Sequence, residues 1–389
     1  MRQSDPRAPM AAEVIGDPLA LEALSGEWSD LLAQSDQSSP SLSPVWIAAW
    51  WRVFGGQDGR ELRAVAFRDG RRLVGLAPLA ARRVWSRPGV PTWRLDLLPS
   101  GEREADEILS DYLSVVAARG YEQRVADALG ELLRSGGLGR WDELVMPRMS
   151  TDSVMVSLLG AALERAGKVY FEVTGGSPYI PLPATWDQYL ARLSGSRRRL
   201  VRTSLRDFEA WCGGRSELRA ARNAEELEVG VRILRELHEQ RWQEAGKPGA
   251  FASPLFTAFH ADVMPTLLER GELELMWLSA NDQPIAATYN VVWNGAVQFY
   301  QSGRRMDLPR ELRPGVVLHA LAIRRAIELE RREYDFLAGG SRYKTDLALA
   351  VRPLCCLQVV RRRRAELARR AYARASSMVR AATISRRNP

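Results

Sequence analysis

The sequence is short of the residues that build disulfide frameworks and zinc clusters. Its 389 residues include three cysteines, two of which, Cys355 and Cys356, are adjacent, and three histidines. So few cysteines cannot form a disulfide framework, and the sequence therefore indicates a reducing compartment. Because the histidines are spread along the chain, a Cys/His zinc cluster is excluded and we expect no metal cofactor.

Long apolar runs are also missing. No stretch approaches 18 uninterrupted apolar residues, so we expect no helix that spans a membrane. Residues 1–18 mix charged residues with prolines and lack the apolar core of a secretion signal. These two absences lead us to expect a cytoplasmic protein.

Lysine is scarce too, and the basic charge is concentrated at one end. Arginine supplies 52 of the 55 basic residues, which codon bias explains more simply than selection. The net charge of +8 is uneven, because residues 361–389 hold ten arginines and one glutamate, a net of +9, which leaves −1 for the rest. We expect a basic tail that is either solvated or held by charge at an anionic membrane surface. Nucleic acid is not an expected partner of the nearly neutral body.

The remaining composition is that of a folded protein with room for two domains. Hydrophobic residues make up 46% of the chain and charged residues 26%, as in ordinary globular proteins. A chain of 389 residues favours two domains of common size. The extended, proline-bounded passage at 178–183 is the best candidate for the boundary.

Hydrophobic periodicity changes from helix to strand early in the chain. Trp46, Trp50 and Phe54 recur at every fourth position after Pro44, which predicts a helix with an aromatic, core-facing side. Two apolar or alternating runs, at 62–67 and 73–79, then flank an Asp-Gly pair. That pair between two such runs predicts a β-hairpin.

The strand pattern returns in the second half of the chain. Residues 273–278 and 284–292 flank a polar turn, and a third run follows at 296–300. Val74-Gly75 matches Ile285-Ala286 at a constant offset of 211 residues. This recurrence, halfway along the chain, predicts two copies of one α+β unit.

The stretch from Phe299 to Lys344 is the most informative about chemistry. A predicted strand ends in a polar loop that holds four arginines, at 304, 305, 310 and 313. Pro314-Gly315 then opens a predicted helix over 316–330, and a strand follows at 334–337. The free N–H groups and the dipole of a helix N-terminus attract anions, and arginines add charge-assisted contacts to phosphate. An ordinary helix start is the other interpretation of the same residues.

Several short motifs, in this order, resemble the GNAT-type acetyltransferases of cellulose biosynthesis. The matching residues are Ser43-Pro44-Val45-Trp46 with Trp50 and Trp51, Gly75-Leu76-Ala77-Pro78-Leu79, Asp111-Tyr112, Arg197-Arg198-Arg199-Leu200-Val201-Arg202, Leu237-His238, Arg241-Trp242, Gly249-Ala250-Phe251, Pro284-Ile285-Ala286-Ala287, Tyr300 with Gly303, Pro314-Gly315, and Tyr334-Asp335-Phe336-Leu337-Ala338-Gly339 with Tyr343-Lys344. The order and spacing of these motifs carry the resemblance more than any one of them does.

The resemblance implies an α+β fold of two tandem GNAT-like domains, each a mixed, mostly antiparallel sheet flanked by helices. It places an N-terminal domain without a cofactor loop at 13–183 and a basic linker helix at 184–211. A C-terminal domain with the acyl-CoA site follows at 212–360, and the basic tail occupies 361–389.

The resemblance also implies an acyltransferase of the EC 2.3.1 type, most simply an N-acetyltransferase. Its co-substrate would be acetyl-CoA or another acyl-CoA, and its acceptor an amine or hydroxyl of a small molecule or polysaccharide precursor. In the family the pantetheine lies beside a splayed strand and the pyrophosphate at a helix N-terminus, which implies cofactor contacts at Arg304, Arg313, Gly315, Val316 and Tyr343. The loop departs from the family pattern because it holds one glycine instead of two.

Four residues are candidates for catalysis, each with a structural alternative. His238 is the candidate general base, or a helix-surface or capping histidine. Tyr300 would protonate the leaving thiolate, or pack as an aromatic residue on its strand. Asp335 lies among apolar neighbours and needs a partner, for which Lys344 is the candidate. We expect the other two histidines and the adjacent cysteines to be structural.

Two other functions stay open. One is an aminoacyl-tRNA-dependent transferase like the Fem enzymes that bridge peptidoglycan, which share the tandem layout. The basic tail and the arginines of 197–206 favour it, whereas the lack of a heptad pattern for a coiled-coil arm does not. The other is a non-catalytic accessory protein of envelope polysaccharide production, which the single-glycine loop favours.

Overall fold

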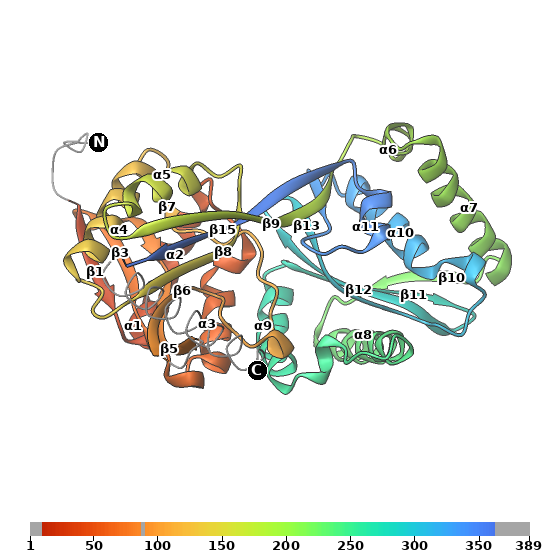
Figure 1. The fold of residues 1–389 in the computed structure, drawn as a ribbon. Helices are drawn as coiled ribbons and strands as arrows, with labels where there is room; N and C mark the ends of the chain where they lie inside the picture. Colours follow the sequence, from red (N-terminus) through yellow and green to blue (C-terminus); the bar gives the residue numbers. More distant parts are fainter. Residues whose placement is uncertain (1–9, 87–89, 362–389) are drawn as a thin grey trace, which may run out of the picture. The chain divides into compact units, whose positions relative to one another are not determined.

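The computed structural model describes residues 10–86 and 90–361 (Figure 1). The predicted basic tail therefore lies outside the described residues, apart from Arg361. Within the described ranges, no helix has the length and apolar character needed to cross a membrane. In the same ranges, no three or more His, Cys, Asp or Glu side chains are grouped so that they could hold a metal ion.

The chain forms two compact units. The first holds the described residues up to Gly101, then Tyr112–Thr174, then those from Cys355 onward. The second holds Glu102–Asp111 and Gly175–Leu354. Each unit is therefore assembled from segments that are distant in the sequence.

The first unit contains two sheets. One has the strand order β1-β3-β4-β7. The other is the part of an 11-stranded sheet that runs in the order β9-β15-β8-β6-β5-β2. The strands are β1 (Ala11–Ile15), β2 (Glu61–Leu62), β3 (Ala64–Asp69), β4 (Arg72–Ala77), β5 (Leu79–Ser86), β6 (Val90–Leu97), β7 (Val116–Ala117), β8 (Glu143–Ser150), and parts of β9 (Lys168–Pro181) and β15 (Ala350–Val360). The predicted hairpin is confirmed, since β3 and β4 pair antiparallel around Gly70.

Helices and short 3-10 turns accompany these sheets. They are α1 (Pro18–Ala23), α2 (Ser25–Ala33), η1 (Pro40–Leu42), α3 (Pro44–Phe54), η2 (Gln57–Gly59), α4 (Glu122–Ser135) and α5 (Val154–Leu163). Helix α3 confirms the predicted aromatic helix, because Trp46, Trp50 and Phe54 are each at most 2% exposed. Its first turn is capped by Ser43, whose hydroxyl accepts the Trp46 N–H, and Pro44 occupies the first helical position.

The second unit is built around one sheet. Its strands follow the order β10-β11-β12-β13-β14-β9. They are β10 (Ser216–Ala220), β11 (Leu273–Ala280), β12 (Gln283–Trp293), β13 (Ala296–Arg304), β14 (Glu333–Asp335) and the end of β9. The helices and turns are η3 (Glu104–Asp106), α6 (Trp186–Arg192), α7 (Gly195–Cys212), α8 (Ala224–Glu244), η4 (Ala250–Ala252), α9 (Pro254–Glu269), η5 (Arg310–Leu312), α10 (Pro314–Glu328) and α11 (Arg342–Leu347).

Helices cover both faces of this sheet. Helix α8 packs on β11, β12 and β13 from one side, whereas α7 and α10 pack together on the other side (Figure 1). The core between sheet and α10 is apolar and includes Val297, Phe299 and Ile323, none of them more than 4% exposed. This burial fixes α10 over β13, and that placement determines the site described below.

Helix α7 is the predicted basic linker helix, and the structure corrects that assignment. It belongs to the second unit and buries Val201, Phe208 and Cys212, each at most 2% exposed. Phe208 and Cys212 pack with Ile285 and Val317, which lie on β12 and α10. The helix is amphipathic: Arg199, Arg202 and Arg206 are exposed, whereas Arg197 and Arg198 are half-buried.

The two units also divide the chain differently from the predicted domains. The boundary falls within β9, because its last residues, Tyr179–Pro181, pair antiparallel with β14 of the second unit. Conversely, residues from Cys355 to Val360 end the chain's last strand in the first unit. Strand β9 therefore begins in the first unit and ends in the second, and β15 begins in the second unit and ends in the first. A single domain boundary at 183 does not describe this exchange of strands.

The predicted duplication is visible in the strand order. In the first unit β3 and β4 form an antiparallel hairpin, and β6, α4 and the parallel strand β8 follow, with β5 and β7 as additional strands between them. In the second unit β11 and β12 form the hairpin, and β13, α10 and the parallel strand β14 follow. Apart from the additional strands β5 and β7 of the first unit, both units share the succession of hairpin, strand, helix and parallel strand.

Candidate acyl-donor site

The central strand of the second unit is paired on one edge for only part of its length. β13 runs parallel to β14 over Ala296–Gln298 and then continues to Arg304. Within the described part of the chain, no strand pairs with this edge of β13 beyond Gln298. The two strands splay apart there, and the open edge offers backbone N–H and C=O groups to a ligand.

Helix α10 begins beside this open edge. Arg313 precedes it with a φ of +43°, a left-handed conformation that is uncommon for a residue with a side chain. Pro314 stands at the first helical position and contributes no N–H group, while the Arg313 carbonyl accepts the N–H groups of Val316 and Val317. The sharp turn at Arg313 directs the positive end of the helix dipole toward the space next to β13.

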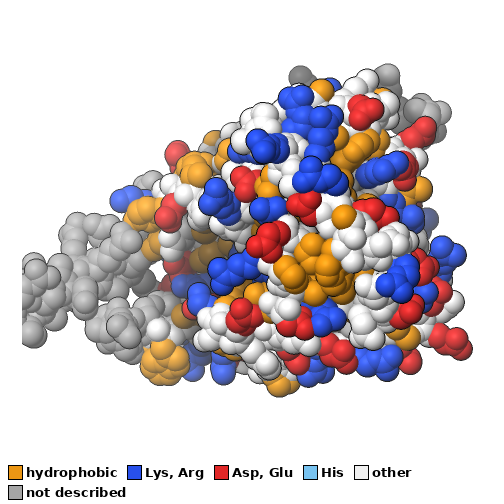
Figure 2. Space-filling view, turned by 90° about the vertical axis from the view of Figure 1, so that its right-hand side faces the viewer, with side chains coloured by type: hydrophobic (Ala, Val, Ile, Leu, Met, Phe, Trp, Pro, Cys, Tyr) orange, Lys and Arg blue, Asp and Glu red, His pale blue; other side chains and the backbone are white. Residues whose placement is uncertain are grey.

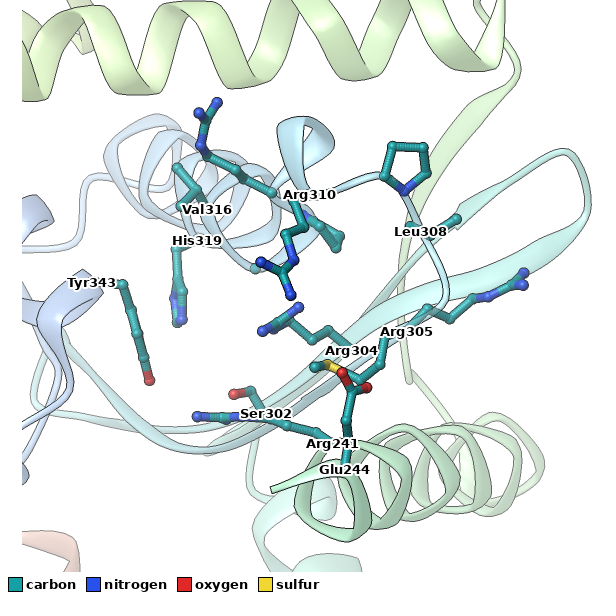
Figure 3. A pocket seen from close by; sticks show the side chains of 15 residues that line it. Arg241, Glu244, Ser302, Arg304, Arg305, Leu308, Arg310, Val316, His319 and Tyr343 are labelled. Carbon is teal, nitrogen blue, oxygen red and sulfur yellow. The ribbon is translucent and has the colours of Figure 1, made fainter. Parts of the chain in front are cut away.

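A cavity of about 520 Å³ occupies this space. It is lined by Arg241, Glu244, Ser302, Arg304, Arg305, Met306, Leu308, Pro309, Arg310, Arg313, Pro314, Gly315, Val316, His319 and Tyr343. Figure 3 shows His319 and Tyr343 toward one end and Leu308 and Arg305 toward the other, with the guanidinium group of Arg304 between them. The lining thus carries five arginines and a single acidic residue.

Four of these arginines form no ion pair among the described residues: Arg241, Arg304, Arg310 and Arg313. Arg305 pairs with Asp307, and Arg313 donates to the backbone carbonyl of Glu311. Burial lowers the pKa of Arg304, and the charge of Arg241 lowers it further. The charge of Glu244 acts in the opposite direction on this pKa, but the cavity keeps an excess of positive charge, which favours the binding of an anion.

Aromatic and polar groups meet at the other end of the cavity. The rings of His319 and Tyr343 stack with centroids 5.0 Å apart and an angle of 18° between their planes. Burial raises the pKa of Tyr343 to about 12, although its hydrogen bond with Ser302 acts in the opposite direction. At neutral pH this end therefore presents a neutral phenol, a hydroxyl and an imidazole.

The predicted cofactor-binding residues come together in the structure. Arg304, Arg313, Gly315, Val316 and Tyr343 all line the cavity, although they come from β13, the loop after it, α10 and α11. The side chain of Arg304 lies 3.4 Å from the position that a β-carbon on Gly315 would take. What these residues bind stays a prediction, but their convergence on one cavity is a structural fact.

The predicted catalytic residues lie outside the residues that line the cavity. His238 is 1% exposed, and both of its ring nitrogens contact the backbone at 3.1 Å: Nδ1 the carbonyl of Ser302, and Nε2 the N–H of Ala250. Because Nε2 accepts a hydrogen bond, Nδ1 carries the proton and donates it. No lone pair of the ring is left to take a proton from a substrate, so the geometry does not favour a general base here.

Tyr300 is also engaged with the backbone. Its hydroxyl donates to the carbonyl of Ile108, and its ring packs against His260, Phe256 and Tyr289. This matches the alternative of a packed aromatic residue. Nothing in this geometry directs the phenol into the cavity, so its role as a proton donor stays a prediction.

Asp335 and Lys344 have partners other than each other. Asp335 accepts the N–H of Leu337 at 2.7 Å and a hydrogen bond from Arg352 at 3.1 Å. Lys344 donates to the carbonyls of Phe336 and Ala338 at 2.7 and 2.8 Å. Both side chains therefore fix the segment that follows β14, and Arg352 takes the place of the expected partner of Asp335.

The two cysteines at 355 and 356 belong to the first unit and are free thiols. Cys355 is fully buried, and burial raises the pKa of its thiol to about 11. Burial also raises the pKa of the Cys356 thiol. Neutral thiols are poor nucleophiles, in line with the structural role expected from the sequence.

His319 is a cavity residue that sequence reasoning missed. It lies five residues beyond Pro314 in an apolar helix, and the surrounding Val317, Leu318 and Ala320 indicate only a buried position. The sequence around His319 gives little indication of a site, because Tyr343, which stacks on it at the cavity, comes from a separate helix, α11. Arg241 belongs to the Arg241-Trp242 motif and not to the predicted site residues, and the structure places it in the cavity.

Comparisons with known proteins agree with this architecture. Residues 195–345, less than half of the chain, match the family model described as "Acetyltransferase (GNAT) domain". The crystal structure of FemX matches with a TM-score of 0.59 and 11% identity, over 90% of this chain and 97% of that one. L-PGS from Bacillus licheniformis matches with a TM-score of 0.52 and 13% identity, over 90% and 93%. No curated protein sequence matches the chain.

A further structure, the C-terminal domain of a putative lysylphosphatidylglycerol synthetase from Agrobacterium fabrum, gives a TM-score of 0.51 at 10% identity, over 88% of this chain and 92% of that one. At such low identities these matches show the fold alone. They confirm the predicted α+β fold of two tandem GNAT-like units. The narrower resemblance to cellulose-biosynthesis acetyltransferases is not shown by them.

Proposed function

We propose that this chain is an acyl-CoA-dependent acyltransferase whose donor binds in the cavity of the second unit. The observation that carries the proposal is the open edge of β13 beside the N-terminus of α10. Around it lie Arg241, Arg304 and Arg310, which form no ion pair with any residue that the structure describes. An acyl-CoA combines an anionic diphosphate with an amide-containing pantetheine arm. Those are the two kinds of group for which this arrangement supplies partners.

The diphosphate has two sources of stabilisation in the cavity. The N-terminal turn of α10 supplies a partial positive charge, and the arginines supply charge-assisted hydrogen bonds. We expect the single glycine of the loop, at 315, to be sufficient, because the side chain of Arg304 lies beside it and would contribute donors that extra backbone N–H groups would otherwise give. The pantetheine amides would pair with the free edge of β13 as a further strand does.

The acceptor would be an amine or a hydroxyl, and N-acetylation is the simplest form of the reaction. The place of the reaction in envelope polysaccharide biosynthesis is part of the proposal and rests on the sequence resemblance. A screen of amino sugars, polyamines and amino acids with acetyl-CoA, with release of the free CoA thiol as the signal, would identify the acceptor class.

Calorimetry with acetyl-CoA tests the donor. We expect one site per chain, and Arg304→Ala should weaken binding by roughly 10- to 100-fold, the loss of one or two charge-assisted hydrogen bonds. The matched control is Arg324→Ala, because Arg324 lies on α10, away from the cavity lining, and is exposed and paired with Glu328. No binding by a folded wild-type chain, or equal effects of both substitutions, would contradict the proposal.

An aminoacyl-tRNA donor is the second candidate. The exposed face of α7 supports it, because Arg199 and Arg202 are exposed there and form no ion pair among the described residues, and α7 packs against η5 at the cavity. Figure 2 views the side of the molecule on which α7 lies, and Lys and Arg side chains gather on its upper part. Salt-dependent binding of tRNA, together with no heat from acetyl-CoA, would favour this donor over acyl-CoA.

A further inference from the structure

One side chain in the cavity has an unused polar atom. His319 is 2% exposed, and its only hydrogen-bond partner among the described residues is the hydroxyl of Tyr334, 3.3 Å from Nδ1. Its other nitrogen, Nε2, has no partner in these residues. Figure 3 shows the ring pointing from α10 into the cavity, beside Tyr343 and toward Ser302.

The hydroxyl of Tyr334 decides where the ring proton lies. Tyr334 is fully buried, and Nδ1 of His319 is the only acceptor that its hydroxyl contacts among the described residues. If Nδ1 carried the proton, the hydroxyl proton of Tyr334 would lack an acceptor, and an unpaired buried donor costs about 1–3 kcal/mol. The favoured arrangement has Tyr334 donating to Nδ1, which leaves the ring proton on Nε2, inside the cavity.

The surroundings keep this ring neutral. Burial lowers the pKa of His319 to about 3, and the positive charges of Lys344 on α11 and Arg241 on α8 act in the same direction. The other titratable groups packed against it are the phenols of Tyr334 and Tyr343, and burial raises the pKa of both. At neutral pH the ring is an imidazole that donates through Nε2 and has no free lone pair for proton abstraction.

We infer that His319 is a catalytic hydrogen-bond donor to the thioester carbonyl oxygen of the acyl donor, a role that rests on the proposed function. Attack by the acceptor nitrogen or oxygen forms its bond to the carbonyl carbon and moves the C=O electron pair onto oxygen. The Nε2–H group stabilises that oxyanion, as preorganised donors do in other acyl transfers. The carbon–sulfur bond then breaks, the thiolate takes up a proton, and the proton lost by the acceptor passes to solvent, not to His319.

Histidine NMR tests the proton position without any turnover. The chain has only three histidines, so the ring nitrogens of labelled protein can be assigned from His238→Gln and His260→Gln variants. We expect the His319 ring to be neutral with its proton on Nε2 between pH 5 and 8. In Tyr334→Phe the His319 ring should be a mixture of the Nε2–H and Nδ1–H forms, because Nδ1 loses the hydroxyl that donates to it. A proton on Nδ1, or titration near pH 6.5, in the wild-type chain would overturn the inference.

A pair of ligands tests the contact with the carbonyl. Acetyl-CoA should shift the Nε2–H resonance of His319, whereas S-ethyl-CoA, which has the same length but no carbonyl oxygen, should not. Calorimetry of the same samples separates the two claims. Binding of both ligands with identical His319 resonances removes this role but keeps the proposed function, whereas no binding of either ligand removes both.

Substitutions test the contribution to the rate. Release of the thiol from bound acetyl-CoA, with water as acceptor, should fall by roughly 10²- to 10³-fold in His319→Ala, the usual loss of one oxyanion donor. Acetyl-CoA affinity should change little, and His319→Gln, which keeps an N–H donor, should restore part of the rate. Thermal unfolding of each variant confirms that it is folded. Equal rates in the wild type and a folded His319→Ala chain would also overturn the inference.

Discussion

Gly303 on β13 lies against the backbone of Leu237 on α8, where a β-carbon would stand 2.6 Å from the Leu237 carbonyl carbon. Real β-carbons essentially never come this close to another heavy atom, so the helix and strand approach each other only because residue 303 is a glycine. This contact holds Arg241, one turn further along α8, beside Arg304, the next residue of β13. The cationic lining of the cavity therefore depends on a glycine outside it.

We predict that Gly303→Ala lowers the free energy of unfolding by about 1–3 kcal/mol, the usual cost of overpacking a tight contact. Gly315→Ala is the matched control, because a β-carbon there meets only Arg304, at 3.4 Å, an ordinary contact with a flexible side chain. Urea unfolding followed by circular dichroism measures both. Equal stability of the two variants would show that α8 and β13 can separate without cost.

Salt should weaken acetyl-CoA binding through the phosphates alone. Because Arg241, Arg304 and Arg310 form no ion pair within residues 10–86 and 90–361, they are available to attract a diphosphate, and that attraction is screened as ionic strength rises. S-acetylpantetheine, which lacks the diphosphate and the nucleotide, should bind more weakly at low salt, by roughly 10-fold or more, and respond little to salt. Calorimetry at 50 and 500 mM NaCl, ~10-fold apart, covers the range over which screening changes most. A salt response that is the same for both ligands would place the diphosphate elsewhere.

The protein should begin to lose stability at a pH well above the pH range in which carboxylates protonate. Burial lowers the pKa of His238 to about 4 and those of His260 and His319 to about 3, so the unfolded chain binds protons near pH 6.5 while the folded chain does not. The stability is therefore complete above the unfolded pKa and is lost as pH falls from about 6.5 toward 4, at up to roughly 1.4 kcal/mol per histidine per pH unit. Urea unfolding at pH 7, 6 and 5 measures this loss. His260→Phe should reduce the slope by one proton, and identical curves at pH 7 and 5 would refute the account.

Lys344 should matter for stability more than for chemistry. Its ammonium group donates to the carbonyls of Phe336, Leu337 and Ala338, so Lys344→Met leaves buried acceptors without donors. We expect a loss of about 1–3 kcal/mol in the free energy of unfolding. Lys168→Met serves as the control, since Lys168 is exposed and lies over the ring of Tyr170. A fully stable Lys344→Met variant that has lost turnover would instead restore Lys344 as a catalytic residue.

Much of the fold could be predicted from the sequence because it is encoded locally. The spacing of Trp46, Trp50 and Phe54 predicted one helix, and the Asp-Gly pair predicted one hairpin. The offset of 211 residues between Val74 and Ile285 revealed the repeat, since both residues lie on the second strand of their hairpin. These features depend on neighbours in the chain and not on distant contacts.

The division into units and the catalytic residues could not be predicted in the same way. The pairing of Tyr179 with Asp335 is a contact between residues far apart in sequence, and no local pattern encodes it. His238 was selected for its residue type, and only the structure shows that Ser302 and Ala250 occupy both of its nitrogens. The residues predicted to bind the cofactor do line one cavity, although what they bind stays a prediction. A helix N-terminus preceded by arginines has a local signature that the sequence displays.

The most direct test of the central claim is a crystal structure of the full chain with acetyl-CoA. We predict density for the diphosphate at the N-terminus of α10, in contact with Arg304 and Gly315, and for the pantetheine along the open edge of β13 beyond Gln298. The thioester carbonyl should then lie next to His319. An acetyl-CoA that binds at saturating concentration in any other place, with this cavity empty, would contradict the account.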